Sequence, residues 1–239
     1  SLIPPYLRRT KSLDKLLPLL YLRGISTGDF QQALSPLLGA DAKNVSHTSI
    51  SRLKSVWTNE YHSWNKRDLS RKSYVYWWVD GIYLQARMED AKDCVLVIIG
   101  VTEQGKKELI AIEDGYRESK ASWQSLIRDL KFRGIASGPC VAVGDGALGF
   151  WAAITEEYPK TRHQRCWVHK TVNVLDKMAK SMRSKAKSML HDIWMAEDKK
   201  TAERAMDTFI NTHELKYPKA TRCLAKDRED LLTFYDFPA

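Results

Sequence analysis

The chain has 239 residues, of which 44% are hydrophobic and eight are tryptophan, which is enough for a sizeable core and excludes a largely disordered protein. No apolar stretch approaches the roughly 20 residues that span a bilayer, and the N-terminus lacks the features of a signal peptide. The four cysteines are widely spaced and form no CxxC, which argues against a disulfide framework and against a four-cysteine zinc site. We therefore expect a soluble, cytoplasmic protein with no membrane partner.

The formal net charge of +9 is concentrated in two separate regions. Residues 1–72 carry 12 Lys and Arg against 5 Asp and Glu, and residues 160–187 carry 9 basic residues against one acid, Asp176. Two concentrated basic regions fit a polyanion such as DNA better than a uniformly basic surface would, because each cation that neutralises a phosphate releases counterions.

The first 72 residues are predicted to form a small all-α module. Three segments with cap-type residues and helical apolar spacing are expected to be helices: 12–24, 26–39 and 44–57. Because the third segment is polar and basic, we expect a helix-turn-helix-like DNA-binding module, with Arg52 and Lys54 as DNA contacts. An ordinary small helical bundle is the alternative.

From residue 73 the pattern changes to strands. The β-branched and aromatic runs at 74–88, 94–102 and 106–114 are separated by turn signals and predict an antiparallel meander. An amphipathic helix at 119–134, a short strand at 140–145, a helix at 147–158 and a strand near 162–168 follow. The order β-β-β-α-β-α-β predicts an α/β domain with a ribonuclease H-like mixed sheet, here residues 73–239, and the segment from about 170 to 230 is expected to be wholly helical.

Two aspartates stand where strand-like runs meet glycine. Asp80 follows "VYWWV", and Asp145 follows "VAVG" and precedes another glycine. A carboxylate at the end of a buried strand is costly unless something uses it. In a ribonuclease H-like sheet the two strands are neighbours, so the carboxylates are expected to converge and to hold Mg²⁺ (or Mn²⁺) for phosphodiester chemistry. Two unrelated turn aspartates are the alternative.

The segment "RHQRCWVHK" gathers two histidines, a cysteine and several cations. His163, Cys166 and His169 have three-residue spacing, but zinc would need a fourth ligand. We therefore expect a packed Cys and Trp with histidines near phosphate, and metal binding by this segment stays open as the alternative. The cations that are expected to contact DNA in this region are Arg162, Arg165 and Lys170.

At this point the chain resembles a known family. The segments "YVYWWVDGIYLQARMED", "VGDGALGFW" and "TRHQRCWVHKTVNVLDK" look like the mutator-type transposases of bacterial insertion sequences, and the resemblance continues to "LLTFYDFPA". It implies a DDE-type ribonuclease H-like catalytic core with a helical insertion after the fifth strand, at about residues 170–230, in which Asp80 and Asp145 are the first two catalytic acids. It also implies that Cys166 and His169 form the family's C-x-x-H signature.

The resemblance also implies a third catalytic acid, a glutamate on a helix beyond the insertion, which we do not find within residues 1–239. We expect the chain to be truncated at both ends and to lack this final catalytic helix. If a carboxylate within the chain completes the site instead, Glu113 and Asp114 are the first candidates.

These observations favour a DNA transposase that catalyses Mg²⁺-dependent cleavage and strand transfer at insertion-sequence ends. The alternative is a catalytically inactive DNA-binding fragment that represses its parent enzyme. The expected partners are double-stranded DNA, as terminal repeats and as target, and further copies of the chain in a homo-oligomer on DNA. The expected location is the bacterial cytoplasm, in association with the nucleoid.

Overall fold

The computed structural model describes residues 47–84, 93–115, 117–146 and 148–237, together with the single positions Asp29, Gln32 and Pro36. The chain divides into two units, Ser1–Arg67 and Asp68–Ala239. This division lies five residues before the expected domain boundary at residue 72, inside a polar, charged segment.

The first unit contributes one described helix, α3, which spans His47–Asn65. It contains most of the third predicted helix and runs eight residues past the expected end at Trp57. The first two predicted helices lie almost entirely outside the described residues, so the helix-turn-helix-like arrangement stays a prediction.

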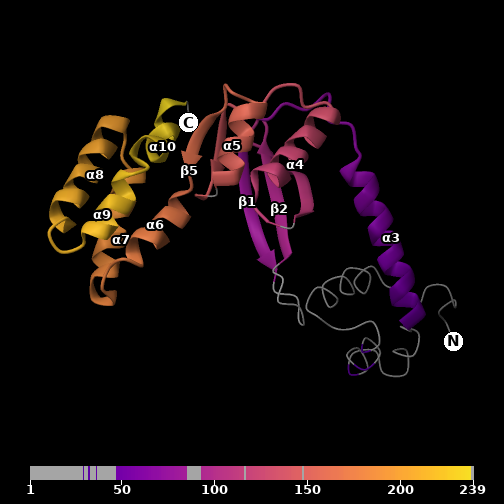
Figure 1. The fold of residues 1–239 in the computed structure, drawn as a ribbon, viewed down its shortest axis with the longest axis horizontal. Coiled ribbons are helices and arrows are strands. Elements are labelled where there is room, and N and C mark those ends of the chain that lie inside the picture. The colour runs from indigo at the N-terminus through magenta and orange to yellow at the C-terminus, as the bar shows by residue number, and fades with distance from the viewer. Residues whose placement is uncertain are drawn as a thin grey trace, which may run out of the picture. The chain divides into compact units, whose positions relative to one another are not determined.

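The second unit is built on a five-stranded mixed sheet, which confirms the predicted α/β class and the predicted order of strands and helices (Figure 1). Its strands, in the spatial order β3-β2-β1-β4-β5, are antiparallel from β3 to β1 and parallel from β1 to β5. The strand bounds are β1 Tyr76–Leu84, β2 Asp93–Val101, β3 Lys107–Gly115, β4 Val141–Gly144 and β5 Arg162–Arg165.

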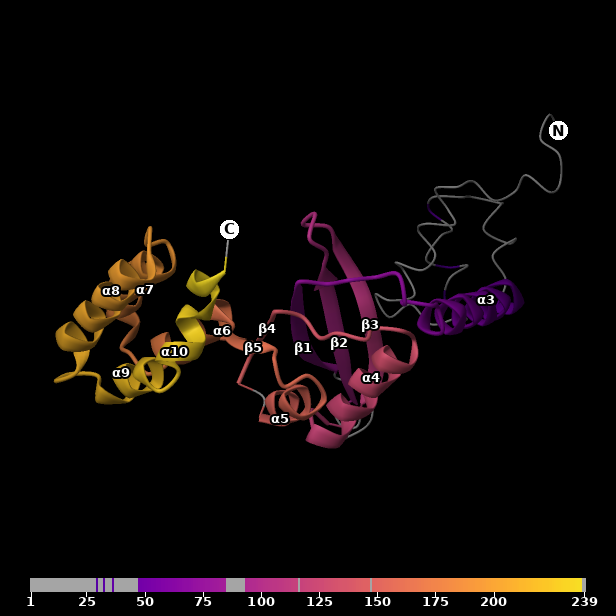
Figure 2. The ribbon, with the colours of Figure 1, turned by 90° about the horizontal axis from the view of Figure 1, so that it is seen from above.

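Helices α4 (Lys120–Phe132) and α5 (Leu148–Glu157) cover one face of the sheet (Figure 2). Ser119 caps α4 by accepting a hydrogen bond from the backbone N–H of Ser122. The predicted apolar stripe of α4 is buried and meets Trp77 of β1, which is fully buried. This burial, worth roughly 25 cal/mol per Å² of apolar surface, holds the α4–α5 layer on the sheet.

The opposite face of the sheet is partly open among the described residues. Trp78, Ile82 and Leu109 are 37%, 45% and 41% exposed. Side chains alternate along a strand, so Asp80 lies on the same side of β1 as Trp78 and Ile82. Within the described part of the chain, no helix is long and apolar enough to cross a membrane.

The chain after β5 is helical, as predicted. The elements are α6 (Trp167–Leu175), α7 (Arg183–Trp194), α8 (Lys199–His213), α9 (Pro218–Ala225) and α10 (Arg228–Leu232), with short 3₁₀ turns η2 (Lys180–Met182) and η3 (Thr233–Asp236). They enclose a second hydrophobic core of their own, separate from the core beneath the sheet.

Candidate active site at the ends of strands β1 and β4

The two predicted acids stand on neighbouring strands. β1 and β4 run parallel and adjacent, with Trp78 paired to Val143. Asp80 and Asp145 each lie two residues beyond this pair, so the same register carried forward brings them level on strands that lie about 4.8 Å apart. Asp80 is exposed and Asp145 is half-buried. The expectation that these strands are neighbours is therefore confirmed.

The glycines on either side of Asp145 have close neighbours. A Cβ on Gly144 would lie 2.8 Å from Val79 Cγ2, so glycine at this position lets β4 lie directly against β1. A Cβ on Gly146 would lie 2.5 Å from Nη2 of Arg165, so a side chain there would displace the end of the Arg165 side chain.

Hydrogen bonds hold the loop that carries Asp145. The indole Nε1 of Trp151 donates to the backbone oxygen of Asp145 across 2.9 Å. A guanidinium nitrogen of Arg165 donates to the same oxygen across 2.5 Å. Two donors on one carbonyl fix the peptide plane, and the direction in which the Asp145 side chain leaves the backbone is fixed with it.

A third carboxyl group, which sequence reasoning missed, lies beside this edge. A Cβ on Gly81 would lie 1.7 Å from Oε1 of Glu118, so the Glu118 carboxyl occupies the space beside the residue that follows Asp80. Burial, together with the charges of Asp145 and Asp80, raises the pKa of Glu118 from 4.5 to about 7. The shift shows that negative charge accumulates here, which a bound cation would offset.

Glu113 and Asp114 lie in different surroundings. Burial and the charge of Asp129 raise the pKa of Glu113, and Arg133 opposes them, which places Glu113 near α4. Asp114 is exposed at the end of β3. The carboxyl group whose pKa is raised by the charges of both Asp145 and Asp80 is Glu118, which makes it the candidate third carboxyl near these two residues.

The chemistry of these donors fits Mg²⁺ or Mn²⁺. Both ions prefer oxygen ligands, and Mg²⁺ is usually held by one or two carboxylates plus water and substrate phosphates. Among the residues that the structure describes, no three His, Cys, Asp or Glu side chains form a group that could hold a metal ion. Asp80 and Asp145 are therefore the two carboxylates that could hold such an ion, with water and a substrate phosphate completing its ligands.

Sequence comparison decides the family. All 239 residues match the profile of the transposases of the mutator family. The chain belongs to this family. It is 50% identical over 209 residues to the transposase for insertion sequence element IST2 of Acidithiobacillus ferrooxidans, covering 87% of this chain and 71% of that protein.

Other relatives carry similar descriptions. The chain is 47% identical over 227 residues to the transposase for insertion sequence element IS6120 of Mycolicibacterium smegmatis, covering 95% of this chain and 70% of that protein. It is 29% identical over 239 residues to the transposase for IS905 of Lactococcus lactis, covering 100% of this chain and 60% of that protein.

The C-x-x-H signature of this transposase chain lies next to the candidate site. The backbone N–H of Cys166 donates to the oxygen of Gly144 across 2.7 Å, and Cys166 is the N-cap of α6. His169 is exposed, and His163 packs on Trp151 with ring centroids 4.6 Å apart. No metal-binding group that includes them is found in the described ranges. Cys166 thus extends the backbone pairing beside β4, and His163 packs on the indole that holds Asp145.

The cations that were expected to contact DNA divide into two groups. Arg52 and Lys54 are exposed on α3, and the Arg162 side chain is 54% exposed, with an ion pair to Asp236 at 2.9 Å. Lys170 is 4% exposed and forms an ion pair with Asp227, so its charge is used inside the chain, and the expected contact with DNA stays a prediction. Arg165 points to the Asp145 loop and is 14% exposed, so its charge is also used inside the chain.

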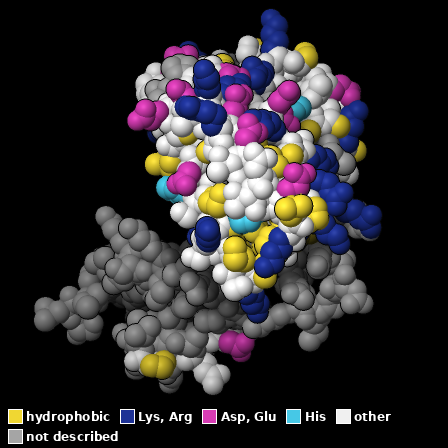
Figure 3. Space-filling model, turned by 90° about the vertical axis from the view of Figure 1, so that its left-hand side faces the viewer, with side chains coloured by type: hydrophobic (Ala, Val, Ile, Leu, Met, Phe, Trp, Pro, Cys, Tyr) yellow, Lys and Arg dark blue, Asp and Glu magenta, His cyan; other side chains and the backbone are white. Residues whose placement is uncertain are grey.

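Other exposed cations lie on the C-terminal helices. Figure 3 faces these helices and shows Lys and Arg side chains spread over their surface among Asp and Glu, and gathered along one side of the view. The exposed lysines between the end of α6 and the middle of α7 are Lys177, Lys180, Lys185 and Lys187. They belong to the basic region that the sequence analysis singled out.

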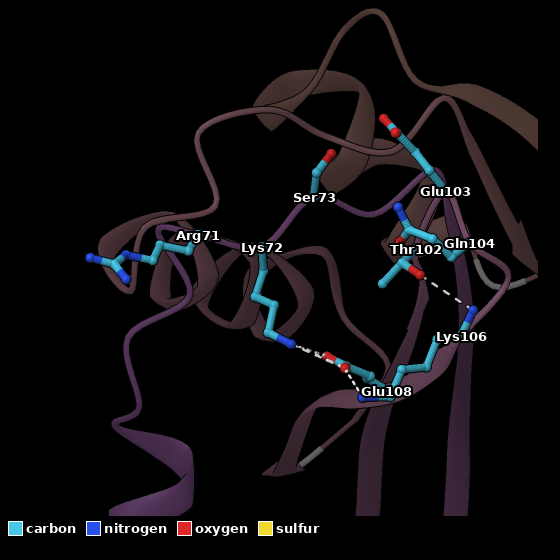
Figure 4. A pocket seen from close by; sticks show the side chains of 8 residues that line it. All are labelled: Arg71, Lys72, Ser73, Thr102, Glu103, Gln104, Lys106 and Glu108. Atoms are coloured by element: carbon cyan, nitrogen blue, oxygen red, sulfur yellow. Dashed lines mark hydrogen bonds and ion pairs between the residues drawn. The ribbon is translucent and has the colours of Figure 1, made fainter.

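A polar pocket lies at the other end of the sheet (Figure 4). It is lined by the turn between β2 and β3 and by the segment before β1, and Val101 at this end pairs with Tyr76, the first residue of β1. Lys72 and Lys106 both contact the Glu108 carboxylate at 2.9 Å. Because both lysines pair with Glu108 and a second carboxylate, Glu103, lines the pocket, the pocket is a poor cradle for a phosphate.

Proposed function

We propose that this chain carries out the DNA cleavage and strand transfer of an insertion-sequence transposase, with Asp80 and Asp145 as metal-binding catalytic acids on a ribonuclease H-like sheet. The observation that carries the proposal is the adjacent, parallel pairing of β1 and β4, which brings Asp80, in the middle of β1, level with Asp145, just past the end of β4, in a member of a transposase family. The strand order and the two covering helices are compatible with that fold.

The proposed reaction has two displacements at phosphorus. In the first, water attacks a phosphodiester at the element's end, the bond from phosphorus to the 3′ oxygen breaks, and a 3′-OH is released. In the second, this 3′ oxygen attacks a target phosphodiester and displaces the target's own 3′ oxygen. A bound divalent cation supplies activation of the attacking oxygen and charge stabilisation of the leaving oxygen.

The chain's own residues would bind the ion and orient its ligands. Asp80 and Asp145 would hold the ion, and the ion would offset the repulsion between these carboxylates and the substrate phosphate. Trp151 and Arg165 keep the Asp145 loop in one orientation by binding its backbone oxygen. Glu118 adds a third negative group, which lowers the free energy of the ion-bound state because the ion offsets its repulsion with Asp80 and Asp145. The basic surfaces, including Arg52, would bind DNA phosphates.

The test is a nicking assay with the full chain on supercoiled DNA that carries the ends of the element, with Mg²⁺ and with EDTA. Asp80→Asn and Asp145→Asn should each abolish nicking and leave DNA binding in EDTA largely intact, because affinity rests on phosphate contacts elsewhere. Asp114→Asn is the matched control, since it removes an exposed carboxylate near the end of β3, which β2 separates from β1.

The outcomes separate the alternatives. Nicking that survives either substitution would contradict the assignment of the site. DNA binding by the unchanged chain without any Mg²⁺-dependent nicking would favour the non-catalytic, DNA-binding alternative. Supershifted DNA complexes that contain two differently tagged copies would support the proposed homo-oligomer on DNA.

A further inference from the structure

A buried group of charges joins the C-terminal helices to the sheet. Asp227, which precedes α10, contacts the guanidinium of Arg165 at 3.3 Å and the ammonium of Lys170 more closely. All three side chains are at most 15% exposed. Lys170 also donates to the backbone oxygen of Cys223 in α9 across 3.0 Å. One carboxylate from the helical part thus pairs with two cations, the largely buried Arg165 of β5 and the buried Lys170 of α6.

The same Arg165 reaches the candidate active site from the other side. It is the last residue of β5 and pairs with Gly144, the last residue of β4. Its Nη1 donates to the oxygen of Asp145, and its guanidinium lies against the Cα of Gly146, where any Cβ would lie 2.5 Å from Nη2. Arg165 therefore connects Asp227 to the loop that carries Asp145.

We propose that Asp227 and Arg165 form a positioning link, through which the packing of the C-terminal helices sets the orientation of Asp145 and with it the divalent-cation affinity of the active-site edge. The inference rests on the proposed function, in which Asp145 is a metal ligand. Arg165 and Asp227 are positioning residues, because they act through the Asp145 backbone.

The chemistry of the group explains why the link depends on both residues. A guanidinium is planar and presents several N–H donors in a fixed fork, so it can bind a carbonyl and a carboxylate at once, whereas an ammonium cannot reproduce that geometry. Without the Asp227 charge, two buried cations would face each other without a counter-charge, and Arg165 would leave the Asp145 loop. Partners that orient metal ligands typically contribute 10- to 100-fold to metal affinity.

The experiment measures Mn²⁺ binding to the full chain by calorimetry, with no DNA and no turnover. Arg165→Lys keeps the charge that pairs with Asp227 and removes the fork. Asp227→Asn keeps the side-chain volume and removes the counter-charge. We expect each to weaken Mn²⁺ binding about tenfold, with circular dichroism showing that the chain remains folded.

The matched control is Asp236→Asn. Asp236 also joins β5 to the C-terminal helices, through Arg162 at 2.9 Å, and Arg162 lies at the opposite end of β5 from Arg165. The Asp236→Asn variant should leave Mn²⁺ affinity unchanged. If it weakens binding as much as Asp227→Asn does, loss of helix docking in general is responsible, and the specific link is wrong.

Asp145→Asn separates this inference from the proposed function. If Asp145→Asn leaves Mn²⁺ binding unchanged, the proposed metal site itself is wrong. If Asp145→Asn removes binding and a folded Arg165→Lys variant binds Mn²⁺ as the unchanged chain does, only the positioning link is overturned. If Asp227→Asn unfolds the chain, the Mn²⁺ affinity of the Arg165→Lys variant alone decides whether the positioning link is right.

Discussion

The carboxyl group of Glu118 occupies the space that any side chain at Gly81 would need. A Cβ at Gly81 would lie 1.7 Å from Oε1 and 2.4 Å from Cγ of Glu118. The absence of a side chain at position 81 therefore leaves room for the carboxyl group of Glu118, which lies in the segment before α4. This relationship places Glu118 at the edge where the pKa of its carboxyl, raised first by burial, also responds to Asp145 and Asp80.

Gly81→Ala should displace Glu118 and destabilise the folded chain by about 1–3 kcal/mol, the usual cost of forcing extra volume into a packed site. The measurement is urea unfolding of the single variants and of Gly81→Ala/Glu118→Ala. Because Glu118→Ala removes the clashing atoms, the alanine at position 81 should cost much less in that background. Equal costs in both backgrounds would show that Glu118 does not lie beside Gly81.

The Arg52 and Lys54 side chains on α3 should contribute to DNA affinity through phosphate charge. In the full chain, Arg52→Ala and Lys54→Ala should each weaken duplex binding and reduce the slope of log affinity against log salt by about 1. Fluorescence anisotropy between low and moderate salt measures both quantities. Lys216→Ala, which removes an exposed lysine after α8, is the control and should leave the slope unchanged. An unchanged slope in the α3 variants would favour a plain helical bundle.

The polar pocket in Figure 4 predicts an acid-sensitive contribution to stability. Hydrogen bonds from Lys106, Lys72 and Tyr74 lower the pKa of Glu108 from 4.5 to about 2. Between these two pH values the unfolded chain binds more protons than the folded chain, so the contribution of Glu108 is complete above pH 4.5 and is lost as pH falls toward 2.

Glu108→Gln should therefore lower the free energy of unfolding near pH 7 by about 1 kcal/mol, because the two lysines are largely solvent-exposed and such pairs are screened. The difference from the unchanged chain should disappear as the pH approaches the lowered pKa of Glu108. Urea unfolding at several pH values measures it, with Glu103→Gln in the same pocket as control. A difference that persists unchanged at the lowest pH would contradict the assigned cause.

The sheet could be predicted because its signals are local. The run before Asp80 is β-branched and aromatic, and the turns that separate the strands are rich in charged residues and glycine, so each strand is recognisable within a few neighbours. The two aspartates were found for the same reason, since each follows a strand-like run and precedes a glycine. Their adjacency followed from the predicted strand order.

The rest of the site could not be predicted because it depends on packing between distant segments. Glu118 precedes a helix cap, and nothing near it in the sequence shows that its carboxyl folds back over Gly81. Charge counting correctly marked 160–187 as basic but could not show which cations are neutralised inside the chain. The partner of Lys170 is Asp227, 57 residues further along.

Comparing Lys170 with Arg162 tests whether a cation of the basic region 160–187 stabilises the fold or binds DNA. It is 4% exposed and paired with Asp227, whereas Arg162, on the preceding strand, has a side chain that is 54% exposed. Lys170→Met keeps most of the apolar stem and removes the charge, which leaves Asp227 with Arg165 alone. Breaking a buried pair by removing one partner typically costs about 3–5 kcal/mol. We expect a loss of about 2–3 kcal/mol in urea unfolding, since Arg165 still compensates Asp227.

The same variant should bind duplex DNA with an unchanged salt slope at temperatures where it is folded, because no phosphate contact is lost. Arg162→Gln should show the reverse behaviour, with a stability change within about 1 kcal/mol, as for other exposed pairs, and a salt slope reduced by about 1. If Lys170→Met reduces the slope and barely changes stability, the buried ion pair opens to meet DNA, and Lys170 returns to the DNA-binding surface.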